Sequence, residues 1–518
     1  MFQRPGLNII DVIKCHAEFR AKKAALICGA RQVTWAEFSG LVNQVANALV
    51  SAGLRKGDKV CLLALNSIEA AAVLFGVLRA GGVIVPLSAL LTPQLIAGLV
   101  KDSNAGFLVV ASPLEPLIQP VMAELGHLPK QRRIALGFAD PDWTPYEVFI
   151  SGASTAVPRV DLEDDDEANI IYSSGTTGVP KGIVHTHLIR ALFSYSLGIE
   201  FRIDSSAKNI VATPLFTNGT WMTLMPSVLA GAASILLPLF TPESFMEAVA
   251  HHRGTHTFLV PTQFQAILDH PDFKRYDLSS LRIMVAAGAI VPLPLKKRIL
   301  EKMGDVLMEL YGLTEGVGTT LKPEDIRIKT GSVGTPIAGT EMLIIDNEGR
   351  VLPRGEVGEI VGYGGGIMKG YHNRPEATAE VVWKDERGRT FLRTGDMGRF
   401  DEDGFLYILD RKKDMIISGG INIFANDIEA VLIQHPEVKD AAVISVPHEK
   451  WGETPLALVI RQPEAATGEE DIRTWANHQL GKYQRISRVE FRDEDFPRNA
   501  LGKVLKRQLR EPYWREVA

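Results

Sequence analysis

Apolar residues in the first quarter of the chain follow two alternating patterns. Over residues 37–50 they recur every three or four positions, which predicts a helix with one buried face. Residues 60–65 form a short, continuous apolar run, which predicts a buried strand. The same two patterns repeat at residues 68–80 and 83–86, and a further strand is predicted at 104–110. This succession indicates a parallel sheet with helices on its faces.

The segment 209–242 carries no charged side chain, which raises the question of a membrane span. A transmembrane helix needs about 20 consecutive apolar residues. Here the apolar run is interrupted by prolines and glycines, namely Pro214, Gly219, Pro226, Gly231 and Pro238. Because proline disrupts the hydrogen bonding of a helix interior, the segment favours buried helices and strands around a binding cavity over a membrane span.

Two changes in composition suggest how the chain is divided. Residues 151–167 are rich in small and acidic side chains, which indicates a surface connection. A second change begins at Arg411, after which short apolar runs at 441–446 and 456–460 alternate with helical stretches. The sequence therefore predicts an α/β protein with a large N-terminal body of mixed, largely parallel sheets with packed helices at 1–410, and a small α+β C-terminal domain at 411–518.

Composition and charge narrow the class of protein. The 518 residues, 46% hydrophobic and 23% charged, are typical of a globular protein of several domains. The net charge of −5, from 56 basic and 61 acidic residues, argues against a nucleic-acid partner. The three cysteines lack paired spacing and predict neither a disulfide framework nor a zinc site. The N-terminal residues lack the apolar core of a signal peptide, so we expect a cytoplasmic protein.

The most informative segment for chemistry is rich in hydroxyl groups and glycine. It follows the apolar run 170–172 and reads Ser173-Ser174-Gly175-Thr176-Thr177-Gly178-Val179-Pro180-Lys181-Gly182. Glycines allow a close backbone approach to a ligand, hydroxyls donate hydrogen bonds and the lysine adds positive charge, which together suit a polyphosphate. The order differs from a P-loop, which needs Gly-Lys followed by Ser or Thr. Composition alone leaves a solvated surface loop open as the alternative.

The order of residues in this segment resembles the signature of the adenylate-forming superfamily, which includes acyl-CoA synthetases, luciferases and amino-acid adenylation domains. Further motifs similar to those of the superfamily follow in the same order, and the resemblance extends from about Thr34 to the last residues. These motifs are Tyr311-Gly312-Leu313-Thr314-Glu315, Leu392-Arg393-Thr394-Gly395-Asp396, Asp410-Arg411-Lys412-Lys413-Asp414 followed by Ser418-Gly419-Gly420, and Pro497-Arg498-Asn499-Ala500-Leu501-Gly502-Lys503. The chain therefore resembles an AMP-dependent acid:CoA ligase of the fatty-acyl or hydroxycinnamate type.

The resemblance implies ATP, Mg²⁺ and coenzyme A as ligands, and it implies a role for individual residues. Lys503 and Thr314 would act at the α-phosphate, where Lys503 offsets the repulsion between two anions. Glu315 would also be catalytic and would hold Mg²⁺ together with Thr177. Tyr311 would pack against adenine, and Asp396 would bind the ribose hydroxyls. Further nucleotide contacts are implied at Ser173, Ser174, Gly175, Thr176, Thr177, Gly178, Lys181, Gly288, Ala289, Gly312 and Arg411.

In this family the C-terminal domain rotates after the acid has been adenylated, so the resemblance implies that residues 411–518 are mobile. Lys413 stands at the position of the hinge, where a few backbone dihedral angles can absorb the rotation. Gly419 and Gly420 would then line the passage for the thiol of coenzyme A, while Lys503 would leave the site. A plain β-turn is the alternative for the glycine pair.

The acyl pocket is expected at the charge-free segment and at neighbouring loops of small residues. We expect an acid with an uncharged tail, aryl, arylalkenoic such as 4-coumarate, or medium- to long-chain alkyl. The sequence departs from the family pattern at Thr217, where many acyl-CoA synthetases have histidine, and at Ala425, where proline is usual. A role for that histidine therefore cannot be carried over. The expected pocket residues are Thr217, Asn218, Trp221, Ala287 and Gly316.

Two other functions remain open at the level of the sequence. An amino-acid-activating enzyme, or another acid-adenylating enzyme with a different acceptor, would share these motifs. A non-catalytic sensor of nucleotide or coenzyme A would keep only the fold, and the retained Lys503, Asp396 and Glu315 disfavour it. The expected partners are a carboxylic acid, ATP and CoA, without nucleic acid or an integral membrane segment, and a homodimer is left open.

The histidines carry weaker signals. His251, His252 and His256 lie in a polar stretch, and a solvated helix end is the expected location. His185 and His187 follow the phosphate-binding segment, where we expect ordinary loop residues or residues behind the site. None of these histidines is predicted to bind a metal.

Overall fold

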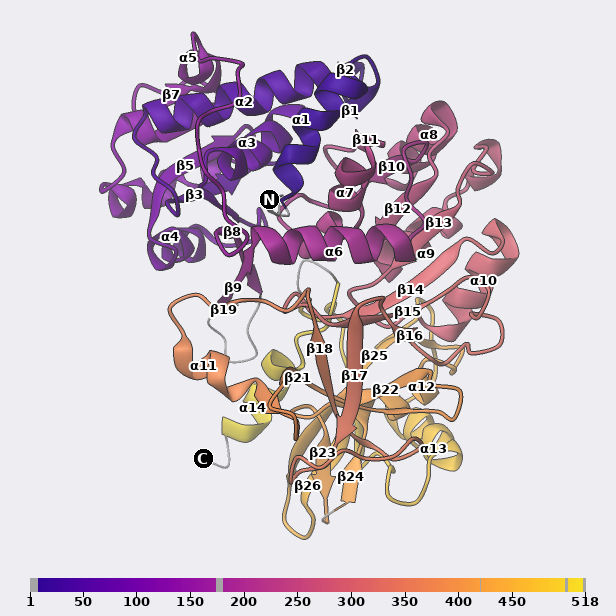
Figure 1. Cartoon of the computed structure of the whole chain (residues 1–518). Coiled ribbons are helices and arrows are strands. Elements are labelled where there is room, and N and C mark those ends of the chain that lie inside the picture. The colour runs from indigo at the N-terminus through magenta and orange to yellow at the C-terminus, as the bar shows by residue number, and fades with distance from the viewer. Residues whose placement is uncertain (1–7, 174–179, 420, 499–501, 516–518) are drawn as a thin grey trace.

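The computed structural model describes residues 8–173, 180–419, 421–498 and 502–515, which form four β-sheets with helices packed against them. Figure 1 shows the N-terminal elements, indigo to pink, above the orange and yellow C-terminal elements. The α/β class with a large N-terminal body and a smaller C-terminal part is confirmed.

The first sheet has eight strands in the order β19-β9-β8-β4-β3-β5-β6-β7. Its centre is parallel, as the alternation of apolar patterns predicts, whereas β9 pairs antiparallel with β8 and β19 pairs antiparallel with β9. Its strands are β3 (Lys59–Leu63), β4 (Val83–Pro86), β5 (Ala105–Ala111), β6 (Arg133–Leu136), β7 (Thr144–Pro145), β8 (Glu167–Ser173), β9 (Lys181–Thr186) and β19 (Gly370–Tyr371).

The second sheet has nine strands in the order β16-β15-β14-β13-β12-β10-β11-β1-β2. The strands from β1 to β14 in this order are parallel, and β2, β15 and β16 join antiparallel at the two edges. Its strands are β1 (Ala24–Cys28), β2 (Arg31–Thr34), β10 (Lys208–Val211), β11 (Ala233–Leu236), β12 (His256–Leu259), β13 (Ile283–Ala286), β14 (Leu307–Gly312), β15 (Gly318–Leu321) and β16 (Thr335–Pro336).

Helices cover these two sheets, and several of them begin at a capping side chain. In α2, the Thr34 hydroxyl accepts from the Glu37 backbone N–H while the Glu37 carboxylate accepts from the Thr34 N–H, which satisfies two amides at the helix start. The helices are α1 (Ile9–Phe19), α2 (Trp35–Ser51), α3 (Ile68–Arg79), α4 (Pro93–Asp102), α5 (Tyr146–Ile150), α6 (His187–Glu200), α7 (Asn218–Ala230), α8 (Pro242–His252), α9 (Pro261–Asp269), α10 (Leu293–Met303) and α11 (Pro375–Glu380), with short 3₁₀ turns η1 (Glu115–Leu117), η2 (Gln119–Leu125), η3 (Lys130–Arg132) and η4 (Phe273–Arg275).

The charge-free segment folds as strand β10, helix α7 and strand β11. Helix α7 is buried over most of its length, and Pro226 lies inside it. Among the residues that the structure describes, no helix is both long and apolar enough to span a membrane. The expectation of buried helix and strand segments is therefore confirmed for this segment.

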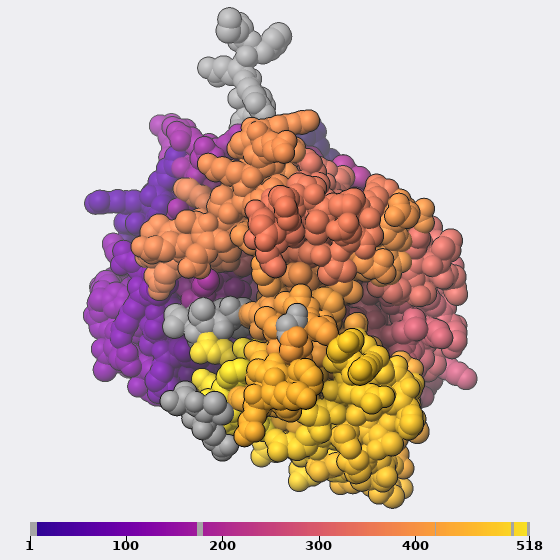
Figure 2. Space-filling view, turned by 90° about the horizontal axis from the view of Figure 1, so that it is seen from below, coloured from indigo at the N-terminus to yellow at the C-terminus, as the bar shows by residue number. Residues whose placement is uncertain are grey.

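The C-terminal residues form two further sheets. The third is antiparallel and contains β17 (Thr340–Ile345), β18 (Gly358–Gly364), β20 (Val382–Lys384), β21 (Thr390–Phe400) and β22 (Leu406–Arg411). The fourth contains β23 (Ile416–Ser418), β24 (Ile421–Ile423), β25 (Val438–His448), β26 (Gly452–Arg461) and β27 (Arg488–Phe491), with α12 (Ala425–Leu432), α13 (Glu469–Gln479) and α14 (Lys506–Arg515). Seen from below, these orange and yellow residues lie beside the purple N-terminal residues (Figure 2).

The chain passes from the third sheet to the fourth between Arg411 and Ile416. The Lys412 N–H still donates to the carbonyl of Gly395 on β21, at 2.9 Å. Side chains also connect the third sheet to α12. Asp410 of β22 is buried, and its Oδ2 accepts from the Ala425 N–H at the start of α12, at 2.6 Å. A proline at position 425 would have no N–H and could not make this bond.

Candidate active site

Residues from three separate motifs meet at the carboxylate of Asp396. Asp396 on β21 lies opposite Arg411 on β22 and is 4% exposed. Its Oδ1 forms an ion pair with Arg411 Nε at 2.8 Å, and its Oδ2 accepts a hydrogen bond from the Tyr311 hydroxyl at 2.8 Å. Burial and the charge of Asp396 raise the pKa of Tyr311 well above its usual value, so the phenol remains a donor.

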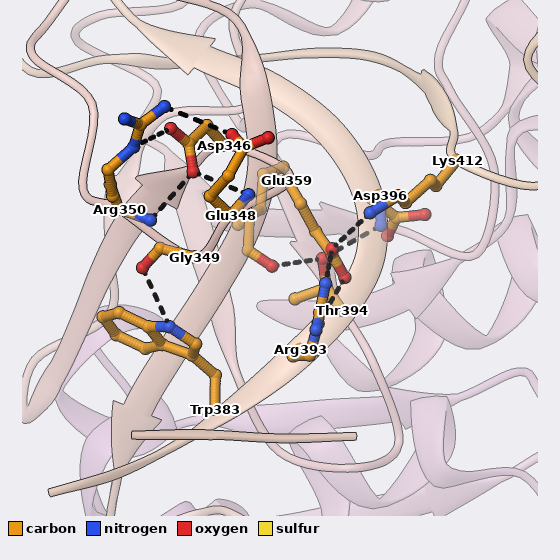
Figure 3. A network of polar contacts seen from close by, with 11 residues as sticks. Asp346, Glu348, Gly349, Arg350, Glu359, Trp383, Arg393, Thr394, Asp396 and Lys412 are labelled. Atoms are coloured by element: carbon orange, nitrogen blue, oxygen red, sulfur yellow. Dashed lines mark hydrogen bonds and ion pairs between the residues drawn. The ribbon is translucent and has the colours of Figure 1, made fainter. Parts of the chain in front are cut away.

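A polar network fixes the backbone around Asp396 (Figure 3). The Asp396 N–H donates to Thr394 Oγ1 at 3.1 Å, and the Thr394 hydroxyl donates to the carbonyl of Ile360 at 2.8 Å. Glu359 of β18 accepts from Arg393 and from Lys412, the latter at 3.0 Å. Although burial opposes ionisation, these two cations hold the pKa of Glu359 below its usual value. Arg393 and Lys412 are thus both tied to Glu359 of the third sheet.

Lys503 lies half-buried within the electrostatic reach of this cluster. Burial, together with repulsion from Arg411, lowers the pKa of Lys503 to about 8, while Asp396 and Asp414 oppose that shift. The adjacent Gly502 packs close to Thr262 at the start of α9, where an added Cβ would lie 3.7 Å from the Thr262 hydroxyl. The C-terminal lysine therefore lies against the N-terminal part of the chain in this arrangement.

Glu315 and Lys181 meet at a tyrosine that the sequence motifs do not include. The Tyr371 hydroxyl donates to Glu315 Oε1 at 2.8 Å, and Lys181 Nζ lies 4.8 Å from the centroid of the Tyr371 ring. Tyr371 belongs to β19, a two-residue strand that pairs with β9, the strand beginning at Lys181. No local spacing signals such a pairing between segments so far apart in the sequence.

The expected pocket and adenine residues follow the carboxyl ends of neighbouring parallel strands. Thr217 and Asn218 come after β10, Ala287, Gly288 and Ala289 after β13, and Tyr311 to Glu315 at the end of β14. Strands β10, β12, β13 and β14 are adjacent and parallel. Their carboxyl ends lie at one edge of the sheet, which is where α/β proteins commonly bind ligands.

Trp221 and Gly316 have roles in packing. Trp221 is fully buried in the core, and its Nε1 donates to the Leu215 carbonyl at 2.7 Å. Gly316 has φ +114, and an added Cβ would lie 1.8 Å from the carbonyl oxygen of Gly366. Glycine is therefore required at 316 by this backbone contact. Thr217 caps α7, accepting from the Thr220 N–H at 3.2 Å.

Several expected contacts fall outside the described residues. They are Ser174, Gly175, Thr176, Thr177, Gly178 and Gly420. The flanking Ser173 and Lys181 lie opposite each other on the antiparallel strands β8 and β9, and Gly312 ends β14. Gly419 has φ +57, and its N–H donates to the Trp451 carbonyl at 2.8 Å.

The histidine prediction holds only in part. His251 and His252 lie in the last turn of α8, as expected of a helix end. For His256 the expectation is wrong, because this residue lies buried in β12 between the Thr255 hydroxyl, at 2.7 Å, and the Phe201 carbonyl, at 3.1 Å. Burial lowers the pKa of His256 to about 4. Within the described ranges, no group of three His, Cys, Asp or Glu side chains is arranged to hold a metal.

Comparison with known families and proteins gives matches over nearly the whole chain. A family model described as "AMP-binding enzyme" matches residues 14–372, and "AMP-binding enzyme C-terminal domain" matches residues 427–503. The chain is 33% identical to the long-chain-fatty-acid–CoA ligase FadD13 of Mycobacterium tuberculosis, covering 93% of each chain. It is 35% identical to a feruloyl-CoA synthase of an Amycolatopsis species, covering 94% of this chain and 95% of the relative.

A solved structure has the same architecture. ATP-bound MatB from Rhodopseudomonas palustris superposes with a TM-score of 0.87 at 30% identity, covering 98% of this chain and 99% of MatB. The similarity includes the C-terminal residues, so both parts of the chain have counterparts in a single known structure.

Proposed function

The chain belongs to the AMP-binding enzyme family, and on that premise we propose that it is an AMP-forming acid:CoA ligase. The enzyme adenylates a carboxylic acid with ATP, releases pyrophosphate and then transfers the acyl group to the thiol of CoA. The observation that carries the proposal is the meeting of Asp396, Tyr311 and Arg411 beside Lys503. These residues come from motifs spread over almost 200 positions, and each is of the type that this chemistry needs.

The charges in the cluster suit the first step, in which the acid carboxylate attacks the α-phosphate. Both reactants are anions, so cations held at the site lower the barrier by stabilising the charge that develops. Lys503 and Arg411 supply two such cations, and the Asp396 carboxylate is positioned to accept hydrogen bonds from ribose hydroxyls. Thr314 and Lys181 are proposed to contact the phosphates.

The residues present also fit a magnesium ion. Mg²⁺ is usually held by one or two carboxylates together with substrate phosphates. Glu315 offers one carboxylate, whose Oε1 is fixed by the Tyr371 hydroxyl while Oε2 remains available in the described structure. We assign Glu315 as the protein ligand, with Thr177 as a second candidate. When bound, the ion neutralises phosphate charge.

Replacing Tyr371 with phenylalanine is expected to raise the Mg²⁺ concentration for half-maximal adenylation by roughly tenfold, because the loss of an outer hydrogen bond frees a metal ligand to rotate. The phenylalanine ring keeps the contact with Lys181, so the ATP concentration dependence at saturating Mg²⁺ should change little. A Mg²⁺ titration of adenylation measures this. Tyr363→Phe, at a 41% exposed position, is the matched control. An unchanged Mg²⁺ dependence in Tyr371→Phe would exclude the positioning role.

The second step is proposed to use a different orientation of the C-terminal domain, residues 411–518, relative to the body, residues 1–410. Lys413 is the proposed hinge, because it lies between Lys412, whose N–H donates to Gly395 of the third sheet, and Ile416, where the fourth sheet begins. The contacts that cross this point would have to break during rotation. They include Ala425 N–H to Asp410, and Asn426 Nδ2 to the Leu409 carbonyl at 2.9 Å.

Replacing Ala425 with proline is expected to favour the second step over the first. The substitution removes the N–H that donates to buried Asp410 and so destabilises the present orientation. Proline is well tolerated as the first residue of a helix, and Phe424 already has the extended φ of −92° and ψ of 115° that a residue before proline prefers. A hydrogen bond to a carboxylate is worth about 1.5–3 kcal/mol, so the ratio of thioester formation to adenylation should rise roughly tenfold or more.

Measuring the rates of the two half-reactions separately tests this prediction. Adenylation is followed by pyrophosphate release, and thioester formation by supplying a synthetic acyl-adenylate with CoA. Ala425→Ser keeps the N–H and is the matched control. If the proline and serine variants give the same ratio, the Asp410 contact has no part in the orientation of the C-terminal domain.

The substrate is proposed to be an acid with an aryl, arylalkenoic or alkyl tail, because the relatives are named for long-chain fatty acids and for ferulate. A panel of aryl, arylalkenoic, C2–C16 alkyl and amino acids, assayed for AMP formation with and without CoA, tests this. Preference for an amino acid, or acid-dependent AMP without any thioester, would point to a different acceptor. Nucleotide binding without AMP formation on any acid would point to a sensor.

We also propose a cytoplasmic location. The sequence prediction left a homodimer open. Cell fractionation tests the location, and light scattering of the purified chain tests the oligomeric state.

A further inference from the structure

Arg190 on helix α6 is a buried cation that packs against α7, the helix of the charge-free segment 209–242. Its side chain lies between β8, β9 and α7, and the residue is 3% exposed. Over the described ranges no carboxylate forms an ion pair with it. Instead, Arg190 Nε donates to Asn169 Oδ1 at 2.6 Å, and Nη1 donates to Asn218 Oδ1 at 2.9 Å. A charge buried among neutral groups is costly, so its partners must be well placed to hold it.

Aromatic faces complete the surroundings of this guanidinium. The Arg190 Cζ atom lies 4.7 Å from the centroid of the Trp221 ring and 5.2 Å from that of Phe193. Cation–π contacts of this kind stabilise a desolvated guanidinium. Trp221, expected to line the acyl pocket, thus supports a charged residue directly behind the pocket residue Asn218.

A guanidinium has only hydrogen-bond donors, so each side-chain atom that bonds to Arg190 must be an acceptor. Asn169 accepts through Oδ1, and its Nδ2 therefore faces His185 Nδ1, at 3.2 Å. Arg190 Nη2 also donates to His185 Nδ1, at 3.2 Å. With Nδ1 accepting, the neutral imidazole carries its proton on Nε2 and donates it to the Thr314 carbonyl at 2.9 Å.

The orientation of the Asn218 side-chain amide follows in the same way. Because its Oδ1 accepts from Arg190, the Nδ2 donors point away from the guanidinium. Asn218 is the first residue of α7 and is partly exposed, unlike the buried residues that follow it. The adjacent positive charge polarises this amide and strengthens its N–H donors. An amide N–H donor of this kind is suited to an oxygen atom of the acid.

We propose that Arg190 is a positioning residue that joins the two halves of the adenylation site: it holds the Thr314 backbone through His185 and presents Asn218 as a hydrogen-bond donor to an oxygen of the acid. This inference rests on the proposed function. It assigns no contact with ATP or the acid to Arg190 itself. Arg190 thereby connects Thr314, the residue expected at the α-phosphate, with Asn218 of the expected acyl pocket.

The kinetic test compares two buried arginines. Arg190→Lys keeps the charge but loses the forked geometry, and Arg79→Lys makes the same change at a 4% exposed arginine of α3 that pairs with Asp11. Adenylation is measured by ATP–pyrophosphate exchange with ferulate, indoleacetate, dodecanoate and palmitate. For the acid of highest rate, Arg190→Lys should lower kcat/KM by roughly tenfold or more through both a higher acid KM and a lower kcat. Arg79→Lys should leave both constants within about threefold of wild type.

A second measurement does not depend on activity. In protein labelled with ¹⁵N-histidine, the His185 signals, assigned through His185→Gln, should show a neutral Nε2–H imidazole throughout the range from about pH 5.5 to 8. Burial and the charge of Arg190 hold the pKa of His185 well below its usual value, and Arg190 is the charged residue in hydrogen-bond contact with it. In Arg190→Gln the pKa of the same imidazole should rise, because the charge that opposes its protonation is removed while its burial remains.

Either of two results would overturn the inference: wild-type kinetics in Arg190→Lys, or a His185 imidazole that titrates within that range in the wild-type protein. Should Arg190→Gln fail to fold, Arg190→Lys carries both measurements. Failure of the proposed function looks different, since the wild-type chain would then form no AMP with any acid while the histidine spectrum could still be as described.

Discussion

Replacing Lys503 with alanine should slow acyl-adenylate formation by roughly 100- to 1,000-fold, because the variant lacks a cation that stabilises developing charge on the phosphate. Thioester formation from a supplied acyl-adenylate and CoA should change by less than about threefold, since the proposed rotation removes Lys503 from the site before that step. Measuring the two half-reactions separately tests the prediction. Equal losses in both would contradict the rotation.

The loss should also have a pH signature. With the pKa of Lys503 lowered to about 8 by burial and by Arg411, the lysine loses its charge as the pH rises through that value. The kcat/KM of adenylation should therefore fall above this pH in the wild-type enzyme and be flat there in Lys503→Ala. Lys439→Ala is the matched control, because this C-terminal lysine is exposed and pairs only with Asp495 at 3.6 Å among its ionic contacts in the described residues.

Removal of the Asp396 carboxylate is expected to have the second large effect. In Asp396→Ala, the Tyr311 hydroxyl and the Arg411 guanidinium lose their shared partner, and the proposed ribose contacts disappear. Hydrogen bonds to a charged group are worth about 1.5–3 kcal/mol each, so kcat/KM for ATP should fall roughly 100-fold or more. Because the proposed acid pocket lies at other residues, the acid KM at saturating ATP should remain within about threefold of wild type.

Two further variants separate binding from folding. Asp396→Asn keeps the shape and one acceptor oxygen, so it should fold normally and lose a smaller part of the ATP dependence. Asp403→Ala removes an aspartate whose side chain is 70% exposed and is the matched surface control. A normal ATP dependence in a folded Asp396→Ala protein would rule out the ribose role.

The sequence predicts those parts of the fold that depend on local pattern. The apolar spacing over 37–50 and 68–80 corresponds to α2 and α3, and the apolar runs correspond to β3 and β4. The order of strands within a sheet could not be predicted, because it depends on contacts between distant segments. Nothing near Gly370 signals that β19 joins the edge of the first sheet beside β9.

The candidate-site residues that belong to a sequence motif could be predicted. Asp396, Tyr311 and Arg411 were expected at one nucleotide, and the structure brings their side chains into contact. Tyr371 and Arg190 were missed, because each acts through partners from other elements and neither belongs to a recognisable spacing.

The charge-free segment shows why the role of Arg190 could not be predicted from the sequence. Counting charges along residues 209–242 gives none, yet Arg190, which precedes the segment in the chain, packs against its Asn218 and Trp221. The environment of a pocket is set by elements that pack together in space, and α6 and α7 are neighbouring helices with a loop and a strand between them in sequence. The contact of Asp410 with Ala425 could not be predicted either, because it needs both a backbone N–H and a side chain from a different element.

The most direct test of the central claim identifies the nucleotide product. The purified chain is incubated with ATP, Mg²⁺ and the acid panel, with and without CoA, and the nucleotides, pyrophosphate and thioesters are quantified by chromatography. We predict acid-dependent formation of AMP and pyrophosphate, with an acyl-CoA only when CoA is present. Production of ADP and phosphate in place of AMP, or AMP formation that is independent of any acid, would contradict the assignment.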